Sequence, residues 1–220
     1  MPRHVVHRLP DAVSFAAGAL VEPAACVLRG VERGRPRPGD AVGVIGIGTL
    51  GSLAVTLARL YAPGTLIAYG IRGDELDFAS TLGADATVQV VDEDPATATH
   101  RLCRGGLDLV IETAGAVEAI ELATRLVRPG GRIVVLGIAG EGKVLELPAD
   151  RIMLGDMDVI GSCSYPTAAW SRVVRLLEQS LVELDPIVTH RFPAERFEDA
   201  FELMDNRDGV VAKVLLEHLA

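Results

Sequence analysis

The sequence has few cysteines, and their placement excludes two kinds of stabilised fold. Cys26, Cys103 and Cys163 lie far apart and form no C-x-x-C pair. This count and spacing exclude a disulfide framework, and they exclude a four-cysteine zinc site built by this chain alone. We therefore expect three partly buried thiols in a reducing compartment.

The sequence also lacks long apolar runs and clusters of basic residues. Gly, Pro or charged residues interrupt each apolar run well before the ~20 residues that a bilayer span requires. The start, Met1-Pro2-Arg3-His4, is not followed by an apolar signal-peptide core, which predicts a cytoplasmic protein. The net charge is −9, and Lys and Arg do not cluster with aromatic residues, so we expect neither nucleic acid nor a membrane surface as a partner.

Apolar strand-like runs alternate with helical patterns in the middle of the chain. Hydrophobic residues make up 49% of the 220 residues, which is enough for a sizeable core. The expected strands are 41–45, 65–69, 87–91, 107–111, 132–136 and 158–161, and the expected helices are 52–61, 74–83, 95–103 and 117–127. Helices of this length between strands imply right-handed crossovers and a parallel sheet covered on both faces. The sequence therefore predicts an α/β fold, a Rossmann-type doubly wound parallel sheet over residues 41–163.

The two flanking parts of the chain show other patterns. In residues 1–40 we expect a short strand at 4–9, an apolar helical turn at 15–20 capped by Ser14, and a second helix that opens at Glu22-Pro23. In residues 164–220 the pattern predicts helices at 170–179 and 194–204 and strands at 187–190 and 210–216.

A glycine motif follows the first expected strand. Gly46, Gly48 and Gly51 fill the pattern G-x-G-x-x-G between an apolar strand and a helical segment. In such a unit the first glycine makes the tight turn, the second lets the backbone approach a pyrophosphate, and the third lets the helix pack close to the strand. Unpaired amides and the helix dipole then favour the phosphate charge. This placement indicates a dinucleotide site rather than a merely structural turn.

The end of the second strand indicates which dinucleotide binds. An acidic residue there usually contacts the ribose hydroxyls of NAD. Here Gly70 occupies that position and Arg72 follows two residues later, while Asp74 and Glu75 are expected to open the next helix. Loss of the carboxylate removes repulsion against a 2′-phosphate, and a guanidinium can pair with that phosphate. We favour NADP over NAD; the alternative is that Arg72 is an ordinary solvated loop residue.

Short segments in a specific order run through most of the chain. They are Leu9-Pro10-Asp11, Gly18 to Pro23, Pro38-Gly39-Asp40, Gly46 to Gly51, Leu82 to Asp85, Asp108 to Gly115, Pro129-Gly130-Gly131, Ile187 to His190 and Lys213-Val214-Leu215. Together they resemble the medium-chain dehydrogenase/reductase superfamily, in particular its zinc-dependent alcohol, polyol and threonine dehydrogenases. The sequence from Tyr69 to Arg72 looks like that of the NADP-preferring members, and Glu22-Pro23 looks like the polyol and threonine branch.

The resemblance implies a role for further residues in cofactor binding. Thr49 and Leu50 would lie under the pyrophosphate and nicotinamide, and Lys213 would reach the pyrophosphate. Thr113 and Ala114 would flank the nicotinamide ribose. The residues that the resemblance places near the nicotinamide carboxamide are Leu136, Ile138, Ile160 and Ser162.

Glu22 is the one residue that the resemblance connects with a metal. It matches a position where the family places a zinc ligand or an adjacent acid, but a helix-opening glutamate is equally explained by the helix dipole. The five histidines, His4, His7, His100, His190 and His218, show no metal-ligand spacing. Catalytic zinc needs about three protein ligands, so Glu22 alone cannot hold it. We expect His190 to be a structural residue.

Members of this superfamily carry an N-terminal GroES-like catalytic domain of roughly a hundred residues or more, a typical domain length. Residues 1–40 look like the last part of that domain and its linking helix, and residues 164–220 like the segment that returns to it. Zinc would then bind only if the catalytic domain were supplied, and the chain alone should be weakly active or inactive. The catalytic residues and the substrate are not indicated.

Three functions remain open at this point. The first is the coenzyme half of an NADP-dependent dehydrogenase that transfers hydride between the nicotinamide and a secondary alcohol or ketone, with a separate catalytic-domain partner as one possibility. The second is a non-catalytic NADP-binding module that acts as a sensor or assembly partner. The third is a relative of the zinc-free quinone or enoyl reductases, against which Glu22-Pro23 argues mildly.

The last expected strand of the sheet predicts a homodimer. Residues 157–162 would form an unprotected apolar edge, which invites pairing with a second strand. The family resemblance implies a two-fold dimer through this edge. We also expect apolar surface to be exposed on residues 1–40 and 164–220.

Overall fold

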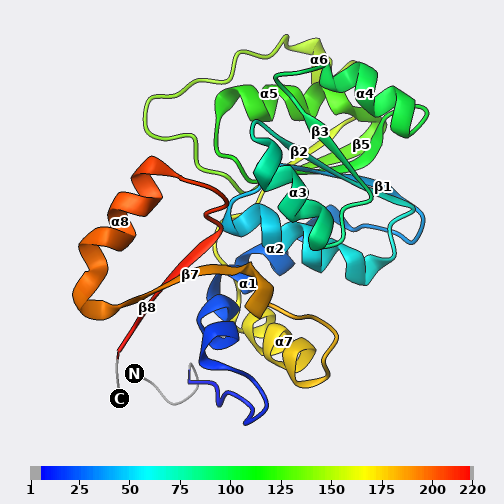
Figure 1. Ribbon diagram of the computed structural model, residues 1–220. Helices are drawn as coiled ribbons and strands as arrows, with labels where there is room; N and C mark the ends of the chain where they lie inside the picture. The colour runs from blue at the N-terminus through cyan, green and yellow to red at the C-terminus, as the bar shows by residue number, and fades with distance from the viewer. Residues whose placement is uncertain (1–5, 219–220) are drawn as a thin grey trace.

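The computed structural model describes residues 6–218 and contains a six-stranded parallel sheet with helices on both faces (Figure 1). The strand order is β3-β2-β1-β4-β5-β6. The strands of this sheet are β1 (Ala41–Ile45), β2 (Thr65–Gly70), β3 (Ala86–Gln89), β4 (Leu107–Glu112), β5 (Val127–Val135) and β6 (Asp158–Gly161). The predicted Rossmann-type doubly wound sheet is therefore confirmed. The largest shift in a strand boundary is in β5, which begins at Val127 rather than Arg132 and includes the Pro129-Gly130-Gly131 segment in an irregular pairing.

Eight α-helices are present in the described range. They are α1 (Phe15–Gly34), α2 (Thr49–Ala58), α3 (Gly73–Thr81), α4 (Pro95–Leu102), α5 (Val117–Leu126), α6 (Asp150–Leu154), α7 (Thr167–Glu178) and α8 (Phe197–Asn206). The short helix α6 has no counterpart among the expected elements. Single 3₁₀ turns occur at Arg59–Tyr61, Asp185–Ile187 and Ala194–Arg196.

The sheet separates two apolar cores. The larger core lies between the sheet and α1, α2, α3 and α7, and the smaller one lies under α4 and α5. Tyr69 in β2 is fully buried in the smaller core, where its hydroxyl lies 2.6 Å from the hydroxyl of Thr99. Burial on both faces explains why these strands are continuous apolar runs rather than alternating ones.

Helix α1 corrects the expectation of two separate elements in residues 15–34. It is one helix that passes through Pro23, and Ser14 caps it as predicted by accepting a hydrogen bond from the Ala17 amide at 2.9 Å. A proline inside a helix costs about 3 kcal/mol because it removes a donor and crowds the preceding turn. Here Leu20 and Val27, on either side of the proline, are both fully buried in the larger core. Burial of one continuous apolar face outweighs the local cost.

The strand expected at residues 4–9 is absent from its described part. Residues 6–9 have no strand conformation, and residues 4 and 5 lie outside the described range. His7 instead stacks on Trp170 of α7, with ring centroids 5.8 Å apart. A strand requires a neighbouring backbone for its hydrogen bonds, and this segment packs against side chains of a helix.

The C-terminal part of the chain forms a separate two-stranded parallel sheet. It pairs β7 (Val188–Pro193) with β8 (Lys213–Glu217), and α8 connects them (Figure 1). Helix α7 packs on α1 and contributes Ala169 and Val173 to the larger core. The expected elements of residues 164–220 are thus present, with β8 starting three residues later than the pattern suggested, at Lys213.

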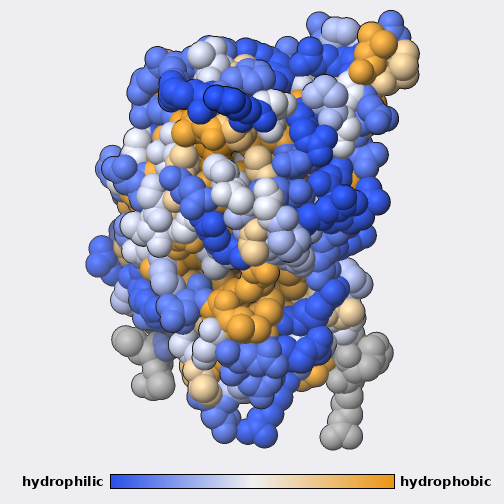
Figure 2. Space-filling model, turned by 90° about the vertical axis from the view of Figure 1, so that its right-hand side faces the viewer, coloured by the Kyte–Doolittle hydropathy of each residue, from blue (hydrophilic) through white to orange (hydrophobic). Residues whose placement is uncertain are grey.

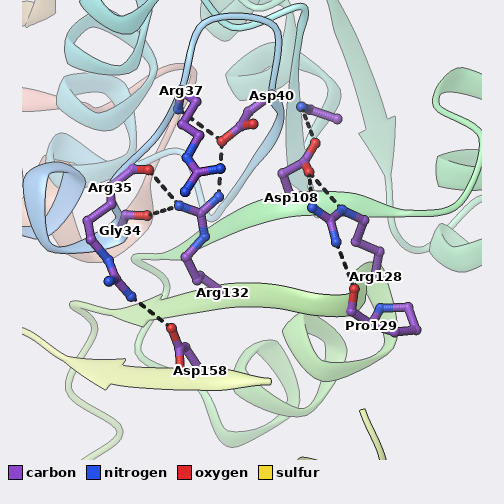
Figure 3. A network of polar contacts seen from close by, with 10 residues as sticks. Gly34, Arg35, Arg37, Asp40, Asp108, Arg128, Pro129, Arg132 and Asp158 are labelled. Carbon is purple, nitrogen blue, oxygen red and sulfur yellow. Dashed lines mark hydrogen bonds and ion pairs between the residues drawn. The ribbon is translucent and has the colours of Figure 1, made fainter. Parts of the chain in front are cut away.

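Arg132 in β5 links α1 to the start of β1 at the amino-terminal edge of the sheet (Figure 3). Its guanidinium donates to the carbonyl oxygens of Gly34 at 2.9 Å and Arg35 at 2.5 Å, and to Asp40 Oδ2 at 3.0 Å. The side chains of Arg132 and Asp40 are only 12% and 13% exposed. This buried pair fixes where α1 ends relative to the sheet.

A second ion pair lies beside it, between β4 and β5. Arg128 Nε donates to Asp108 Oδ1 at 2.7 Å, and the other carboxylate oxygen of Asp108 accepts the Ala41 amide at 2.8 Å. Arg35 and Asp158 form a more exposed pair toward β6. These polar contacts therefore lie at the amino-terminal ends of the strands. Ligands bind in such folds at the opposite, carboxyl ends.

Candidate functional site

A cavity of about 580 Å³ lies at the carboxyl ends of β1, β2 and β4. The strand order reverses between β1 and β4, and open parallel sheets bind their ligands at such a switch point. Of the predicted site residues, the cavity is lined by Gly46, Gly48, Gly70, Thr113 and Ala114. Its volume is in the range of roughly 300–1,000 Å³ that is typical of ligand pockets.

The glycine turn has the geometry that its motif predicts. Gly46 adopts φ +86°, and a Cβ there would meet Ala114 at 2.7 Å. A Cβ on Gly51 would lie 1.8 Å from the Gly46 carbonyl oxygen, so α2 can begin close to the strand only with glycine. A Cβ on Gly48 would meet nothing within 4 Å. The surface above Gly48 is thus open to an approaching ligand, and these residues fit a pyrophosphate.

Thr113 holds the turn from the neighbouring strand. Its hydroxyl lies 2.9 Å from the Ile45 carbonyl oxygen and 2.7 Å from that of Gly46. The Thr113 amide also donates to the Ile45 carbonyl at 3.0 Å. Thr113 and Ala114 therefore form the base against which the glycine turn rests.

The first turn of α2 is connected to the C-terminal sheet. The Thr49 hydroxyl donates to the carbonyl of Ala212, immediately before Lys213. The predicted residue Thr49 therefore contacts the residue directly before the predicted Lys213, although the two are distant in the sequence. Leu50 packs partly buried against the larger core.

The residues predicted near the nicotinamide carboxamide lie at the ends of β5 and β6, outside the lining of the 580 Å³ cavity. The Leu136 amide donates to the Glu112 carbonyl at 2.9 Å, and the Ser162 amide donates to the Val135 carbonyl at 2.9 Å. Ile160 lies in β6, and the side chain of Ile138 is 86% exposed. These residues form a second group, adjacent to the first in the order of the strands.

Glu112 is a buried carboxylate that the sequence reasoning did not single out. Its Oε1 accepts the Gly115 amide at 2.7 Å, and Oε2 is buried without a hydrogen-bond partner among the described residues. Burial raises the pKa of Glu112, and the amides of Gly115, Ala114 and Gly137 act against that rise. The carboxylate links the loops after β4 and β5. The available signal was an acid directly after the expected strand 107–111.

Arg72 lies at the start of α3, but its guanidinium does not line the cavity. It donates to both carboxylate oxygens of Asp74, at 3.0 and 2.5 Å, and to the carbonyls of Arg207 at 2.7 Å and Gly209 at 3.1 Å. The hydrogen bonds from Arg72 lower the pKa of Asp74. Arg72 is thus neither a solvated loop residue nor directed into the cavity.

Four charged residues that the sequence reasoning did not assign line the cavity: Glu75, Glu118, Arg125 and Arg207. Arg125 is paired with Asp94 at 2.7 Å. Burial raises the pKa of Glu75, while the charges of Arg72 and Arg207 act in the opposite direction. Glu75 lies in the first turn of α3, where it was expected to open the helix. Arg207 gave no sequence signal because it follows α8, far from the glycine motif.

Glu22 lies within α1, and its carboxylate is 3.7 Å from Cys26 Sγ one turn later. Burial and the Glu22 charge raise the pKa of Cys26 to about 11. Within residues 6–218, no group of three or more His, Cys, Asp or Glu side chains could hold a metal ion. These residues alone do not fit a zinc site. His190 Nδ1 lies 3.0 Å from the hydroxyl oxygen of its neighbour Thr189, a local structural hydrogen bond.

The model of the family described as "Zinc-binding dehydrogenase" matches residues 49–179. The chain belongs to the zinc-binding dehydrogenase family. The resemblance noted in the sequence is thereby confirmed.

In the part of the chain that the structure describes, no helix is long and apolar enough to cross a membrane.

Individual relatives of this family cover nearly the whole chain. L-threonine 3-dehydrogenase of Bacillus licheniformis is 31% identical over 98% of the chain and 62% of its own length. A Sinorhizobium meliloti structure, described as a candidate zinc-binding dehydrogenase bound to NADP, has a TM-score of 0.85 and 30% identity over 96% of this chain and 61% of its own.

An alcohol dehydrogenase structure from Escherichia coli, complexed with NADH, has a TM-score of 0.87 at 23% identity, which shows a shared fold. The match covers 96% of this chain and 61% of the Escherichia coli protein. Structures of this fold thus carry NADP or NADH. The chain spans about three fifths of the length of the proteins that it matches.

Proposed function

We propose that this chain is the NADP(H)-binding part of a zinc-type alcohol or polyol dehydrogenase. The supporting observation is the intact glycine turn at the 580 Å³ cavity, with Gly70 rather than a carboxylate at the end of β2. A 2′-phosphate carries about −1.5 to −2 charges at neutral pH, so a carboxylate at that strand end would repel it. The Sinorhizobium meliloti relative, at 30% identity, is bound to NADP.

The residues of this chain would bind and orient the dinucleotide. Gly46 and Gly48 would present the backbone to the pyrophosphate, and Lys213 would supply a positive charge beside it. Thr113 and Ala114 would hold the nicotinamide ribose, and Leu136, Ile138, Ile160 and Ser162 would contact the carboxamide. The bound NADP would supply or accept the hydride that moves between its nicotinamide and a secondary alcohol or ketone.

The zinc chemistry implied by the family is not assigned to these residues, because the described residues contain no suitable group of ligands. We propose that a GroES-like catalytic domain, in the same polypeptide or on a partner, provides the metal site and the substrate pocket. On this proposal residues 6–218 bind cofactor but turn over alcohols weakly or not at all. Oxidation of secondary alcohols with NADP at ordinary enzyme rates by the purified chain would contradict it.

The decisive experiment is a titration of the chain with NADPH and with NADH, followed by nicotinamide fluorescence in phosphate-free buffer. The proposal expects NADPH to bind at least about tenfold more tightly, a difference of about 1.4 kcal/mol. Equal or tighter binding of NADH would contradict the NADP assignment. Binding of neither nucleotide would contradict the cofactor-binding function itself.

A further inference from the structure

Arg207 presents an uncommitted positive charge at the cavity. It is the C-cap of α8 with φ +50°, and its amide donates to the Leu203 carbonyl at 2.8 Å. Arg207 is exposed to solvent and is a lining residue of the cavity together with Gly70 and Glu75. Within residues 6–218 its guanidinium has no hydrogen-bond or ion-pair partner, although its charge acts on the nearby Glu75 carboxylate.

Arg72, by contrast, has most of its hydrogen-bonding capacity in use. Four bonds from its guanidinium go to Asp74 and to the carbonyls of Arg207 and Gly209. A guanidinium has five N–H donors, so little remains for a ligand unless the pair with Asp74 breaks. The two carbonyl contacts hold the loop after α8 in place over α3.

These contacts give the two arginines different roles. We propose that Arg207 is the residue that binds the 2′-phosphate of NADP, and that Arg72 acts as a positioning residue that holds the Arg207 backbone beside the cavity. This inference rests on the proposed NADP(H)-binding function and identifies the residue responsible for the nucleotide preference. A free guanidinium can form a bidentate pair with a phosphate, the geometry in which arginine binds such groups most strongly.

The surrounding charges make Arg207 necessary for this preference. Glu75 lines the same cavity, and its carboxylate would repel a phosphate dianion. Asp74 largely neutralises Arg72, to which it is bonded through both oxygens. Arg72 Nε lies 3.9 Å from Glu75 Oε1 and already offsets part of the Glu75 charge. Arg125, the other cation in the cavity lining, is paired with Asp94. Among residues 6–218 Arg207 is therefore the lining cation that can meet a phosphate without giving up an existing ion pair.

The test compares nucleotides that differ only in the 2′-phosphate. The Arg207→Ala variant should bind NADPH and 2′,5′-ADP at least tenfold more weakly than the unaltered chain, and NADH and 5′-AMP within twofold of it. Arg104→Ala is the matched control, because Arg104 is exposed in the turn before β4, at the opposite edge of the sheet, and its loss changes the net charge equally. Unchanged NADPH preference in Arg207→Ala would overturn the inference.

A double-mutant cycle separates direct binding from positioning. Arg72→Ala alone should weaken the binding of NADPH more than that of NADH, because it releases the loop that carries Arg207. In the Arg207→Ala background, the same substitution should change the ratio of the NADPH and NADH affinities by less than twofold. A further loss of the same size as in the single variant would mean that Arg72 binds the phosphate itself, which overturns the assigned roles.

The same titrations distinguish failure of this inference from failure of the proposed function. If the unaltered chain binds neither NADPH nor NADH, the cofactor-binding function is wrong and the inference falls with it. If the unaltered chain prefers NADPH and Arg207→Ala keeps that preference, only the inference is wrong. Thermal unfolding of each variant verifies that the compared proteins are folded.

Discussion

The Thr113 hydroxyl lies 2.7 Å from the carbonyl oxygen of Gly46, across the boundary between the two halves of the sheet. The two residues are distant in sequence, yet this contact positions the turn on which the pyrophosphate would rest. It also connects the loop after β4 to the loop after β1. The switch-point cavity is therefore built from both halves of the fold.

Replacement of Thr113 by valine should weaken the binding of NADPH and of NADH to a similar extent. Valine keeps the shape but loses the hydroxyl, which leaves the Gly46 carbonyl without that donor and costs about 1–2 kcal/mol. NADPH and NADH titrations measure the effect. Thr113→Ser, which keeps the hydroxyl, is the matched control and should bind both nucleotides almost normally. A loss confined to NADPH would contradict the structural role of Thr113.

Two glycines of the motif should respond differently to alanine. Gly51→Ala places a methyl group 1.8 Å from the Gly46 carbonyl oxygen, so the turn must move and stability should fall by about 1–3 kcal/mol. Gly48→Ala meets no protein atom within 4 Å and should leave stability within about 0.5 kcal/mol. Its methyl group would nevertheless occupy the space of the ligand, so nucleotide binding should fall at least tenfold.

Urea unfolding and nucleotide titration of both glycine variants test this contrast. If Gly48→Ala binds NADPH normally, the pyrophosphate does not approach at Gly48. If Gly51→Ala unfolds at the same urea concentration as the unaltered chain, the close approach of α2 to the turn is not required.

The buried pair between Arg132 and Asp40 should contribute strongly to stability. Arg132→Met removes the donor to the carbonyls of Gly34 and Arg35 and leaves Asp40 with the Arg37 amide but without its cation, which should cost about 3–5 kcal/mol. Arg35→Met is the control, because Arg35 and Asp158 are 68% and 56% exposed and such pairs contribute about 0–1 kcal/mol. Urea unfolding measures both. An equal loss of unfolding free energy in Arg132→Met and Arg35→Met would show that burial does not make the Arg132–Asp40 pair more important.

Cys26 should react slowly with alkylating reagents at neutral pH. Burial and the neighbouring Glu22 carboxylate raise the pKa of Cys26 from 9.0 to about 11, so the reactive thiolate is scarce until the solution approaches that pH. Reaction with iodoacetamide should therefore label the exposed Cys163 first and Cys26 increasingly as pH rises, as mass spectrometry of the peptides can follow.

Glu22→Gln provides the sharper form of this experiment. Removal of the negative charge should lower the pKa of Cys26 and increase its labelling rate at pH 8. Glu121→Gln is the control, since Glu121 is an exposed residue of α5 on the opposite face of the sheet. An unchanged rate in Glu22→Gln would show that burial alone controls the thiol.

We propose that the chain forms a homodimer through β6. This strand is one of the two edge strands of the six-stranded sheet, and its residue Val159 is 44% exposed. Large apolar side chains are also exposed elsewhere, including Phe15 and Phe201, and the face in Figure 2 shows apolar patches separated by hydrophilic residues. An uncovered strand edge of this kind favours pairing with a second copy.

Val159→Pro tests the proposed dimer. The Ser162 amide points toward β5, so by strand alternation the Val159 amide points away from the sheet. Proline there removes only an outward donor and should convert a dimer to a monomer in sedimentation at micromolar concentration, with the β5 pairing kept. Val159→Thr should remain dimeric. A monomeric unaltered chain would contradict the proposal.

Local patterns were sufficient to predict most elements of the sheet. Burial on both faces makes each strand a short apolar run, and the strand at 158–161 is present with those bounds. The expectation of two separate elements in residues 15–34 was wrong. Pro23 indicates a helix boundary locally, but the free energy gained by burying one continuous helix depends on the whole core and exceeds the cost of the proline. Glu112 lies inside the segment 108–115 but was given no role, because its burial between the loops after β4 and β5 is a tertiary property. Arg207 was missed because it belongs to no motif.

The sequence by itself determined the parallel sheet and the glycine turn, because both follow from short-range requirements: apolar runs, helical periodicity and residues without a Cβ. Only the tertiary structure decided which charges face the cavity. Arg72, which is close to the glycine motif in sequence, bonds to Asp74 and to the loop after α8. Arg207, distant in sequence, lines the cavity instead. A guanidinium takes the partners that folding brings within reach, and sequence distance does not specify them.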